Sequence, residues 1–307
     1  MQIRKFKSWA IKYLEGFPTA ALDVSVLMEF FLKKDKTQLL LHPEYELSSD
    51  EYAMLYKAVS LRKTGLPVAY ITGRKEFWGY SFIVSPDVLI PKPDTEVLVE
   101  TALSMIVQRL HDEGGKSITL CDICTGSGCV GISVLKALSE MKGGESTRIT
   151  GLTLTDISPA ALNIAERNAR ALLTDKDFKK AEFVLSDLFS RVPQSFDVIL
   201  SNPPYVPATM VDELLKDGRN EPGLALDGDA YGDAADGRTQ SGDGLSIIRS
   251  LVPQCMEHLN EGGLLIIETG EYNALQTKAL FEEAGFRGVR IIKDLEGQER
   301  DVLGVKC

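Results

Sequence analysis

The stretch SITLCDICTGSGCVG, residues 117–131, decides the fold of this 307-residue chain. It begins as an apolar run typical of a buried strand and passes through a glycine-rich turn into a helix predicted over 128–140. Backbone N–H groups in such a turn face a ligand, and Gly126 and Gly128 allow that ligand a close approach. Phosphate binders, dinucleotide binders and methyltransferases all use such turns, so the turn alone leaves the ligand open. No Gly-Lys-Ser/Thr follows it, which excludes a P-loop.

From residue 117 onward, strands alternate with helices. Strands are expected at 117–124, 148–156, 181–186, 195–201 and 262–269, with weaker ones near 289–294 and 301–306. Helices are expected at 128–140, 158–173, 243–260 and 272–285. This alternation predicts an α/β fold with a mostly parallel seven-stranded sheet covered on both faces. Ligands bind such sheets beyond the carboxyl ends of the strands.

Two of the expected strands end in an aspartate. Asp156 ends the second strand, where an acidic residue typically binds the two hydroxyls of a ribose, although it could also cap the helix that starts at 158–159. Asp187 ends the third strand, in a position suited to an adenine amino group, with Leu188 beside it for apolar contact. A glycine-rich turn and two strand-terminal aspartates together predict a cofactor that contains adenosine.

The fourth strand ends in LSNPPYVP, residues 200–207. The side-chain oxygen of Asn202 and the carbonyl oxygen of Pro203 can each accept one N–H bond of a planar amide or aromatic amine, and Pro204 adds no competing donor. Tyr205 can stack on the flat face of such a group. Held in this way, the nitrogen can direct its lone pair at the methyl group of S-adenosylmethionine, so catalysis would come mainly from orientation.

The N-terminal part has a different pattern. Apolar residues fall at helical spacing in two segments, Ile3, Phe6, Trp9 and Tyr13 in the first and Leu22, Val26, Leu27, Phe30 and Phe31 in the second. We therefore expect a small helical docking domain over 1–75, a linking β-hairpin over 76–92 and the sheet-bearing domain over 93–307, which opens with a helix at 95–112.

Composition limits the classes of partner. The net charge of −10 and the pI near 5.0 argue against stable nucleic-acid binding. Residues 1–75 nevertheless hold 12 Lys/Arg against 8 Asp/Glu. No secretion signal and no apolar stretch long enough to span a membrane is present, so we expect a cytoplasmic monomer without membrane contact.

Two further segments carry no predicted chemistry. The C-x-x-C of Cys121 and Cys124 has no second Cys/His pair at metal-ligand spacing, and the two side chains should point to opposite faces of a strand, so no metal is expected. Residues 227–244 are rich in Gly and Asp but lack the ligand spacing of a calcium loop. We interpret them as a solvated surface loop.

Taken together, the motifs resemble the HemK/PrmC family, the protein-(glutamine N5) methyltransferases that modify peptide chain release factors. The resemblance rests on PVAYITGRKEFWGYSFIV, LIPKPDTE, DICTGSG, TDIS, SDLF, LSNPPYVP, EPGLALDG and LNEGGLLIIETG, and covers nearly the whole chain. It implies a class I, Rossmann-like methyltransferase domain that uses S-adenosylmethionine and releases S-adenosylhomocysteine. The implied target is the glutamine of a Gly-Gly-Gln motif, whose methylation modulates translation termination, and the implied role of the N-terminal domain is to help hold the release factor.

The resemblance also implies roles for individual residues. Those expected to bind the cofactor are Thr95, Cys124, Thr125, Gly126, Ser127, Gly128, Asp156, Asp187, Leu188 and Asn202. Those expected to bind and orient the substrate glutamine are Asn202, Pro203, Pro204 and Tyr205, with Asn202, Pro203 and Tyr205 as the catalytic set. Pro93 and Glu96 are expected with Thr95 near the methionine end of the cofactor. The chain departs from the family at Cys124 and Asn273, where Gly and Gln are usual, and in the extra residues within 227–244.

Two alternatives share the same motifs. An adenine-N6 or cytosine-N4 nucleic-acid methyltransferase would present an amine with the same two hydrogens, but it must extract its base and usually carries a basic region. A non-catalytic scaffold that binds S-adenosylmethionine is the other, and the intact Asn202–Tyr205 set argues against it.

Overall fold

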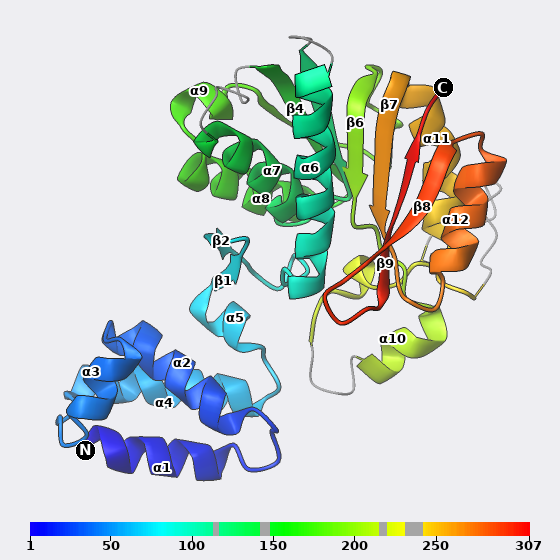
Figure 1. The fold of residues 1–307 in the computed structure, drawn as a ribbon. Helices are drawn as coiled ribbons and strands as arrows, with labels where there is room; N and C mark the ends of the chain where they lie inside the picture. The colour runs from blue at the N-terminus through cyan, green and yellow to red at the C-terminus, as the bar shows by residue number, and fades with distance from the viewer. Residues whose placement is uncertain (113–116, 142–147, 215–219, 231–241) are drawn as a thin grey trace. The chain divides into compact units, whose positions relative to one another are not determined.

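The computed structural model describes residues 1–112, 117–141, 148–214, 220–230 and 242–307 (Figure 1). These residues form two compact units. The smaller unit comprises Met1–Arg74 and Leu214–Asn220, and the larger unit comprises Lys75–Glu213 and Glu221–Cys307.

The larger unit is built on a seven-stranded sheet with the order β5-β4-β3-β6-β7-β9-β8 (Figure 1). Its strands are β3 (Ile118–Ile123), β4 (Ile149–Asp156), β5 (Ala181–Leu185), β6 (Phe196–Ser201), β7 (Leu259–Glu268), β8 (Arg287–Lys293) and β9 (Glu299–Val305). Neighbours from β5 to β7 pair in parallel, whereas β9 is antiparallel to both β7 and β8. The predicted α/β fold with a mostly parallel seven-stranded sheet is confirmed.

Both faces of the sheet are buried. Leu120 and Val198 pack into one apolar cluster, whereas their chain neighbours Cys121 and Ile199 pack into a second cluster on the other face. Strands buried on both faces are apolar throughout, which is why they read as continuous apolar runs in the sequence.

Helices cover the two faces (Figure 1). The first cluster includes side chains of α6 (Glu96–Asp112), α7 (Cys129–Glu140) and α8 (Pro159–Leu172). The second includes side chains of α11 (Ser246–His258) and α12 (Ala274–Glu283). Two short helices, α9 (Asp175–Phe178) and α10 (Ala208–Leu214), were not predicted from the sequence.

A two-stranded sheet precedes α6. It consists of β1 (Arg74–Phe77) and β2 (Tyr80–Ile83), joined by Trp78 and Gly79, which both have positive φ angles of 52° and 72°. Two such residues in a row are typical of the tight turns that join hairpin strands. Glu96 at the start of α6 accepts a hydrogen bond from the Trp78 amide at 2.8 Å and so anchors the turn.

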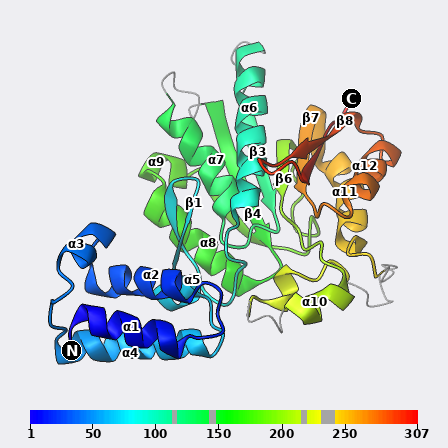
Figure 2. The ribbon, with the colours of Figure 1, turned by 60° about the horizontal axis from the view of Figure 1, so that its bottom comes forward.

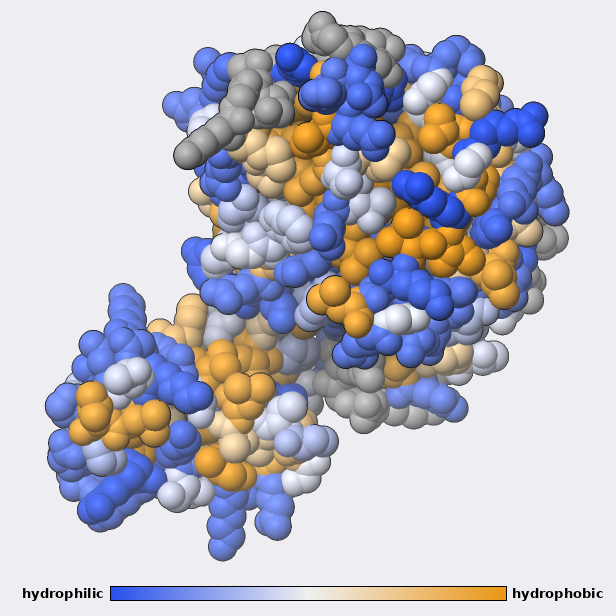
Figure 3. Space-filling model, in the orientation of Figure 1, coloured by the Kyte–Doolittle hydropathy of each residue, from blue (hydrophilic) through white to orange (hydrophobic). Residues whose placement is uncertain are grey.

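The smaller unit is a helical bundle in which α1 and α4 both pack on α2 (Figure 2). Its helices are α1 (Ile3–Tyr13), α2 (Ala20–Leu32), α3 (Lys36–Leu41), α4 (Ser49–Lys63) and α5 (Val68–Thr72). Asp23 on α2 accepts a 2.7 Å ion-pair contact from Nε of Arg62 on α4, and both side chains are largely buried. Figure 3 shows hydrophobic residues interspersed with hydrophilic ones on the visible face of this unit.

The apolar residues at helical spacing do not mark the buried side of α2. Leu22, Val26 and Phe30 are exposed, whereas Val24 and Met28 are buried. Nearly every side of α2 carries apolar residues, so the spacing cannot choose the buried side; the buried Asp23–Arg62 pair shows which side faces α4.

Within the described ranges, no helix combines the length and the apolar character needed to cross a membrane.

Candidate functional site

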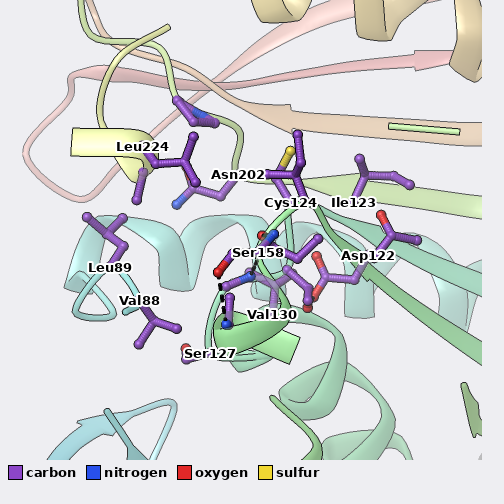
Figure 4. A pocket seen from close by; sticks show the side chains of 18 of the residues that line it. Val88, Leu89, Asp122, Ile123, Cys124, Ser127, Val130, Ser158, Asn202 and Leu224 are labelled. Atoms are coloured by element: carbon purple, nitrogen blue, oxygen red, sulfur yellow. Dashed lines mark hydrogen bonds between the residues drawn. The ribbon is translucent and has the colours of Figure 1, made fainter. Parts of the chain in front are cut away.

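A pocket lies in the larger unit at the carboxyl ends of β3 to β6, where the strand order reverses between β3 and β6. Its empty volume is about 1080 Å³, including open solvent at the mouth. It is lined by residues 87–89, 91–92, 95, 122–127, 129–130, 155–158, 161, 186–188, 202, 204, 222, 224–225 and 247. In Figure 4, Val88 and Leu89 lie on one side of the view and Ile123 and Asp122 on the other, and Leu224 lies next to Asn202.

The glycine-rich turn forms the base of this pocket. Gly126 has a φ of 54°, and apart from its chain neighbours no atom of the described residues lies within 4 Å of where a Cβ would stand, so a ligand can approach the backbone there. Gly128, with a φ of 79°, is the N-cap of α7. A Cβ on Gly128 would lie 2.5 Å from Ile132 Cδ1, so this glycine is required by packing.

Asp122 holds the turn from inside. Its Oδ2 accepts hydrogen bonds from the Thr125 hydroxyl at 2.6 Å and from the Gly131 amide at 2.9 Å. Burial raises the pKa of this carboxyl to about 6. No role for Asp122 followed from the sequence, because an aspartate inside an apolar strand shows no partner until the turn is folded.

Asp156 joins the ends of two strands. Its Oδ2 accepts from the Gly126 amide at 2.8 Å and its Oδ1 accepts from the Ser158 amide at 2.9 Å. Burial raises the pKa of Asp156 above its usual value. The N-cap of α8 is Ser158, whose side chain accepts from the Ala161 amide, so the alternative in which Asp156 caps this helix is wrong.

Asp187 and Leu188 follow β5 and line the same pocket. The Ser186 amide donates to the Asp156 carbonyl at 3.0 Å, which aligns the ends of β4 and β5. Leu188 is buried and has a φ of 45°, a conformation rarely adopted by a side chain of this size. This turn directs one carboxylate and one apolar side chain toward the pocket.

Asn202 follows β6 at the mouth of the pocket. Its Nδ2 donates to the Thr95 hydroxyl oxygen at 3.1 Å, which leaves Oδ1 as the acceptor available to a ligand. Thr95 is buried at the end of a short 3-10 turn, Pro93–Thr95, just before α6. Neither Pro93 nor Glu96 lines the pocket.

Tyr205 is fixed at both of its polar ends. Its hydroxyl donates to Oε1 of Glu268 at 3.1 Å, and its backbone carbonyl accepts from Nδ2 of Asn273 at 3.1 Å. Burial, followed by the Glu268 charge, raises the pKa of Tyr205 well above its usual value. The phenol is therefore neutral and acts as a donor at physiological pH.

The two ends of the Gly/Asp-rich segment meet beside Tyr205. Asp229 is buried and accepts hydrogen bonds from the Gly244 amide at 3.0 Å and the Ser246 hydroxyl at 2.9 Å. Residues 231–241, which include most of the predicted surface loop, lie outside the described residues.

Gly244→Ala should lower both stability and activity. A Cβ on Gly244 would lie 2.2 Å from the Tyr205 carbonyl oxygen, so the Tyr205 backbone must move. We expect a loss of about 3 kcal/mol in the free energy of unfolding, measured by denaturant titration. The matched control is Gly242→Ala, which has a similar φ of 71° but, within the part of the chain that the structure describes, no neighbour within 4 Å. It should cost only about 1 kcal/mol, and equal losses in both variants would refute the packing explanation.

The expectation that Cys121 and Cys124 point to opposite faces of a strand is wrong. Both Cys121 and Cys124 pack against the same apolar cluster instead of opposite faces. The strand ends at Ile123 and Cys124 has a left-handed φ of 59°, so the alternation of side chains stops before it. No group of three or more His, Cys, Asp or Glu side chains among the described residues is arranged to hold a metal ion.

One wall of the pocket was missed by the sequence analysis. Glu221 is buried; it accepts from the Ile90 amide at 3.0 Å and pairs with Lys92 Nζ at 2.7 Å. It thereby joins the 87–92 segment to the 222–225 segment, two stretches more than 100 residues apart. Both lie in motifs that carry the resemblance, but neither contains a residue type that indicates a ligand contact by itself.

Most of the predicted site residues come together. Those that line the pocket are Thr95, Cys124, Thr125, Gly126, Ser127, Asp156, Asp187, Leu188, Asn202 and Pro204. Gly128, Pro203 and Tyr205 stand outside the lining set, Gly128 as a helix cap and Tyr205 bonded to Glu268.

Two protein-family models match this chain. The family model described as PrmC N-terminal domain matches residues 7–73, and the one described as Methyltransferase small domain matches residues 97–219. A release factor glutamine methyltransferase of Koribacter versatilis is 34% identical over 100% of this chain and 99% of that protein. One of Clostridium botulinum is 32% identical over 93% and 92%. Among solved structures, a methyltransferase from Pyrococcus furiosus is similar over 84% of this chain and 99% of its own, with 16% identity and a TM-score of 0.46.

Proposed function

This chain belongs to the family of release factor glutamine methyltransferases, and on that premise we propose that it methylates the side-chain amide nitrogen of a glutamine in a peptide chain release factor. The proposed methyl donor is S-adenosylmethionine, which becomes S-adenosylhomocysteine. The proposed target is the glutamine of the Gly-Gly-Gln motif, whose methylation modulates translation termination in the cytoplasm.

One observation carries this proposal. The Asn202 amide is held by Thr95 at 3.1 Å, so its Oδ1 remains available at the mouth of a pocket whose base is a glycine-rich turn. An acceptor in a fixed direction, next to space for an adenosine-bearing ligand, suits a planar N–H₂ group that must be oriented for attack.

The residues of the pocket fit the cofactor. Thr155 lines the pocket and its buried hydroxyl has no hydrogen-bond partner among the described residues, so the wall offers an unsatisfied polar group to a ligand. Each oxygen of Asp156 makes one backbone hydrogen bond and keeps a further lone pair for a ribose hydroxyl. Asp187 and Leu188 suit the adenine ring, and Gly126 leaves room for the backbone to approach the ligand.

Orientation is the main contribution of the chain to the reaction. An amide nitrogen is a poor nucleophile because its lone pair is delocalised into the carbonyl. Asn202 Oδ1 and the Pro203 carbonyl would each accept one of its two hydrogens, which favours a pyramidal nitrogen and directs the lone pair into the pocket. Bound S-adenosylmethionine would supply an electrophilic methyl group there. The extra proton leaves the nitrogen after transfer, so no strong base has to act first.

The smaller unit is proposed to dock the release factor. Residues 1–75 carry an excess of basic over acidic side chains, opposite to the rest of the chain. Its exposed apolar side chains include Leu22, Phe30, Leu40 and Leu41, which give a protein partner surface to bury.

Incubation with methyl-labelled S-adenosylmethionine tests the proposed function. The candidate acceptors are a release factor, the same factor with the Gly-Gly-Gln glutamine replaced by alanine, and duplex DNA. We expect label on the intact release factor only. Label on DNA would favour an amine methyltransferase for nucleic acid, and binding of the cofactor without label on any acceptor would favour a scaffold.

A further inference from the structure

Two buried carboxyl side chains lie next to each other behind the pocket. Glu268, at the end of β7, and Asp301, on β9, are direct cross-strand partners, and each is no more than 1% exposed. Cβ atoms of such partners lie about 5 Å apart. Neither residue lines the pocket. Burying a charged group is costly unless its hydrogen-bonding capacity is used, so this pair calls for a physical reason.

Glu268 is connected to both ends of the Asn-Pro-Pro-Tyr motif. Its Oε1 accepts from the Tyr205 hydroxyl at 3.1 Å, and its Oε2 has no hydrogen-bond partner among the described residues. The Thr95 hydroxyl lies close enough to the same carboxyl group to lower the pKa of Glu268. The Thr95 oxygen in turn accepts from Asn202 Nδ2 at 3.1 Å. A hydroxyl that gives its single hydrogen to a carboxylate can only accept from its other neighbour, so the charge on Glu268 sets the direction of the Thr95–Asn202 bond.

We infer that Glu268 is a positioning residue for methyl transfer, an inference that rests on the proposed function. By keeping Thr95 and Tyr205 as donors, its carboxylate holds the Asn202 amide with Nδ2 toward Thr95 and Oδ1 toward the substrate. The opposite orientation of Asn202 would present N–H groups to the hydrogens of the substrate amide and repel them. Glu268 also fixes the phenol end of Tyr205, the last residue of the same motif.

Asp301 stays neutral beside this carboxylate. Neither of its carboxyl oxygens has a hydrogen-bond partner among the described residues. Burial, followed by the nearby charge of Glu268, raises the pKa of Asp301 well above its usual value. The proton of the pair therefore resides on Asp301, and Glu268 is the member that ionises.

The ionisation of Glu268 should limit activity at low pH. Burial raises the pKa of Glu268 to about 7, against the hydrogen bonds from Thr95 and Tyr205 and the charge of Arg300, which lower it. The titratable and charged groups that face Glu268 are Asp94, Cys129, Tyr205, Arg300 and Asp301. Below this pH the carboxyl gains a hydrogen on Oε2, the oxygen without a partner among the described residues. The acid can then donate to the Thr95 hydroxyl, so the orientation of Asn202 is no longer fixed. We expect kcat to fall as the pH drops through about 7.

Glu268→Gln and Asp301→Asn form a matched pair of nearly isosteric variants. Glu268→Gln should lower kcat by about 10²-fold while the Kd for S-adenosylmethionine stays within about 2-fold, because a small error in orientation affects the reacting geometry and not cofactor binding. It should also remove the fall in kcat near pH 7. Asp301→Asn imitates the neutral acid and should keep both the wild-type kcat and the wild-type pH profile. Equal losses in the two variants, or an unchanged profile in Glu268→Gln, would overturn the inference.

A second pair of variants applies if Glu268→Gln does not fold, which thermal unfolding would show. Thr95→Val removes the linking hydroxyl and should lower kcat to a similar degree, whereas Thr95→Ser keeps the hydroxyl and should recover most of that loss. Where Glu268→Gln does fold, its loss combined with Thr95→Val should be less than the product of the single losses, since both changes break one chain of bonds. Independent, multiplicative losses, or equal losses in Thr95→Val and Thr95→Ser, would contradict the inference.

The activity of the wild-type enzyme distinguishes a failure of the proposed function from a failure of the positioning role of Glu268. If the wild type transfers no methyl group to a release factor, the proposed function fails and the role of Glu268 fails with it. If the wild type is active and Glu268→Gln is equally active across the pH range, only the positioning role is refuted.

Discussion

Asn202→Ala is expected to lower kcat for methyl transfer to a release factor by about 10³-fold while leaving the Kd for S-adenosylmethionine within about 3-fold. The change removes the acceptor that orients the substrate amide and leaves the turn at Gly126 in place. Among the described residues, the Nδ2 contact to Thr95 is the single side-chain hydrogen bond of Asn202, so the protein should remain folded. Steady-state kinetics with saturating cofactor and calorimetry with S-adenosylhomocysteine measure the two effects separately.

Asn260→Ala is a suitable control for this variant. Asn260 lies near the start of β7, at the end of the strands that faces away from the pocket. Its Nδ2 donates to Asp197 at 3.1 Å. This variant should keep the wild-type kcat. If Asn202→Ala instead loses cofactor binding with kcat retained, Asn202 serves the cofactor and not the substrate amide.

Asp156→Ala should weaken cofactor binding and leave kcat at saturating cofactor unchanged. Its carboxylate accepts from the Gly126 and Ser158 amides and is proposed to accept from the ribose hydroxyls. Loss of two hydrogen bonds to a charged group, each worth roughly 1.5 kcal/mol, corresponds to about a 10²-fold rise in the Kd for S-adenosylmethionine. At saturating cofactor the kcat should recover, because the groups that hold the substrate amide are untouched. Isothermal titration calorimetry gives the Kd directly.

Asp175→Ala is the control for a general charge effect. Asp175 is exposed at the first residue of α9 and does not line the pocket. An equal loss of affinity in both variants would show that net charge, and not the position of Asp156, governs cofactor binding.

The strand ends of the site could be predicted because topology makes them converge. Parallel strands carry their carboxyl ends to one edge of a sheet, so a glycine-rich turn, Asp156, Asp187 and Asn202 at successive strand ends must lie near one another. The apolar runs placed the strands at the centre of the sheet, since nearly every residue of β3 and β6 is buried.

Residues that act through a partner could not be predicted. Glu268 ends an apolar run, GLLIIE, and nothing near it in sequence shows that Tyr205 and Thr95 fold against it. Glu221 and Lys92 are likewise a pair only in three dimensions. The buried side of α2 could not be predicted for the same reason, because the Asp23–Arg62 pair that orients it joins residues 39 positions apart.

The position of the transferred methyl group tests the central claim most directly. After incubation of a release factor with wild-type enzyme and S-adenosylmethionine, fragmentation mass spectrometry of the Gly-Gly-Gln peptide locates the added methyl group. The account predicts a single methyl group on the glutamine side-chain amide with wild-type enzyme, and none with Asn202→Ala under the same conditions. A methyl group on any other residue, or equal modification by Asn202→Ala, would contradict it.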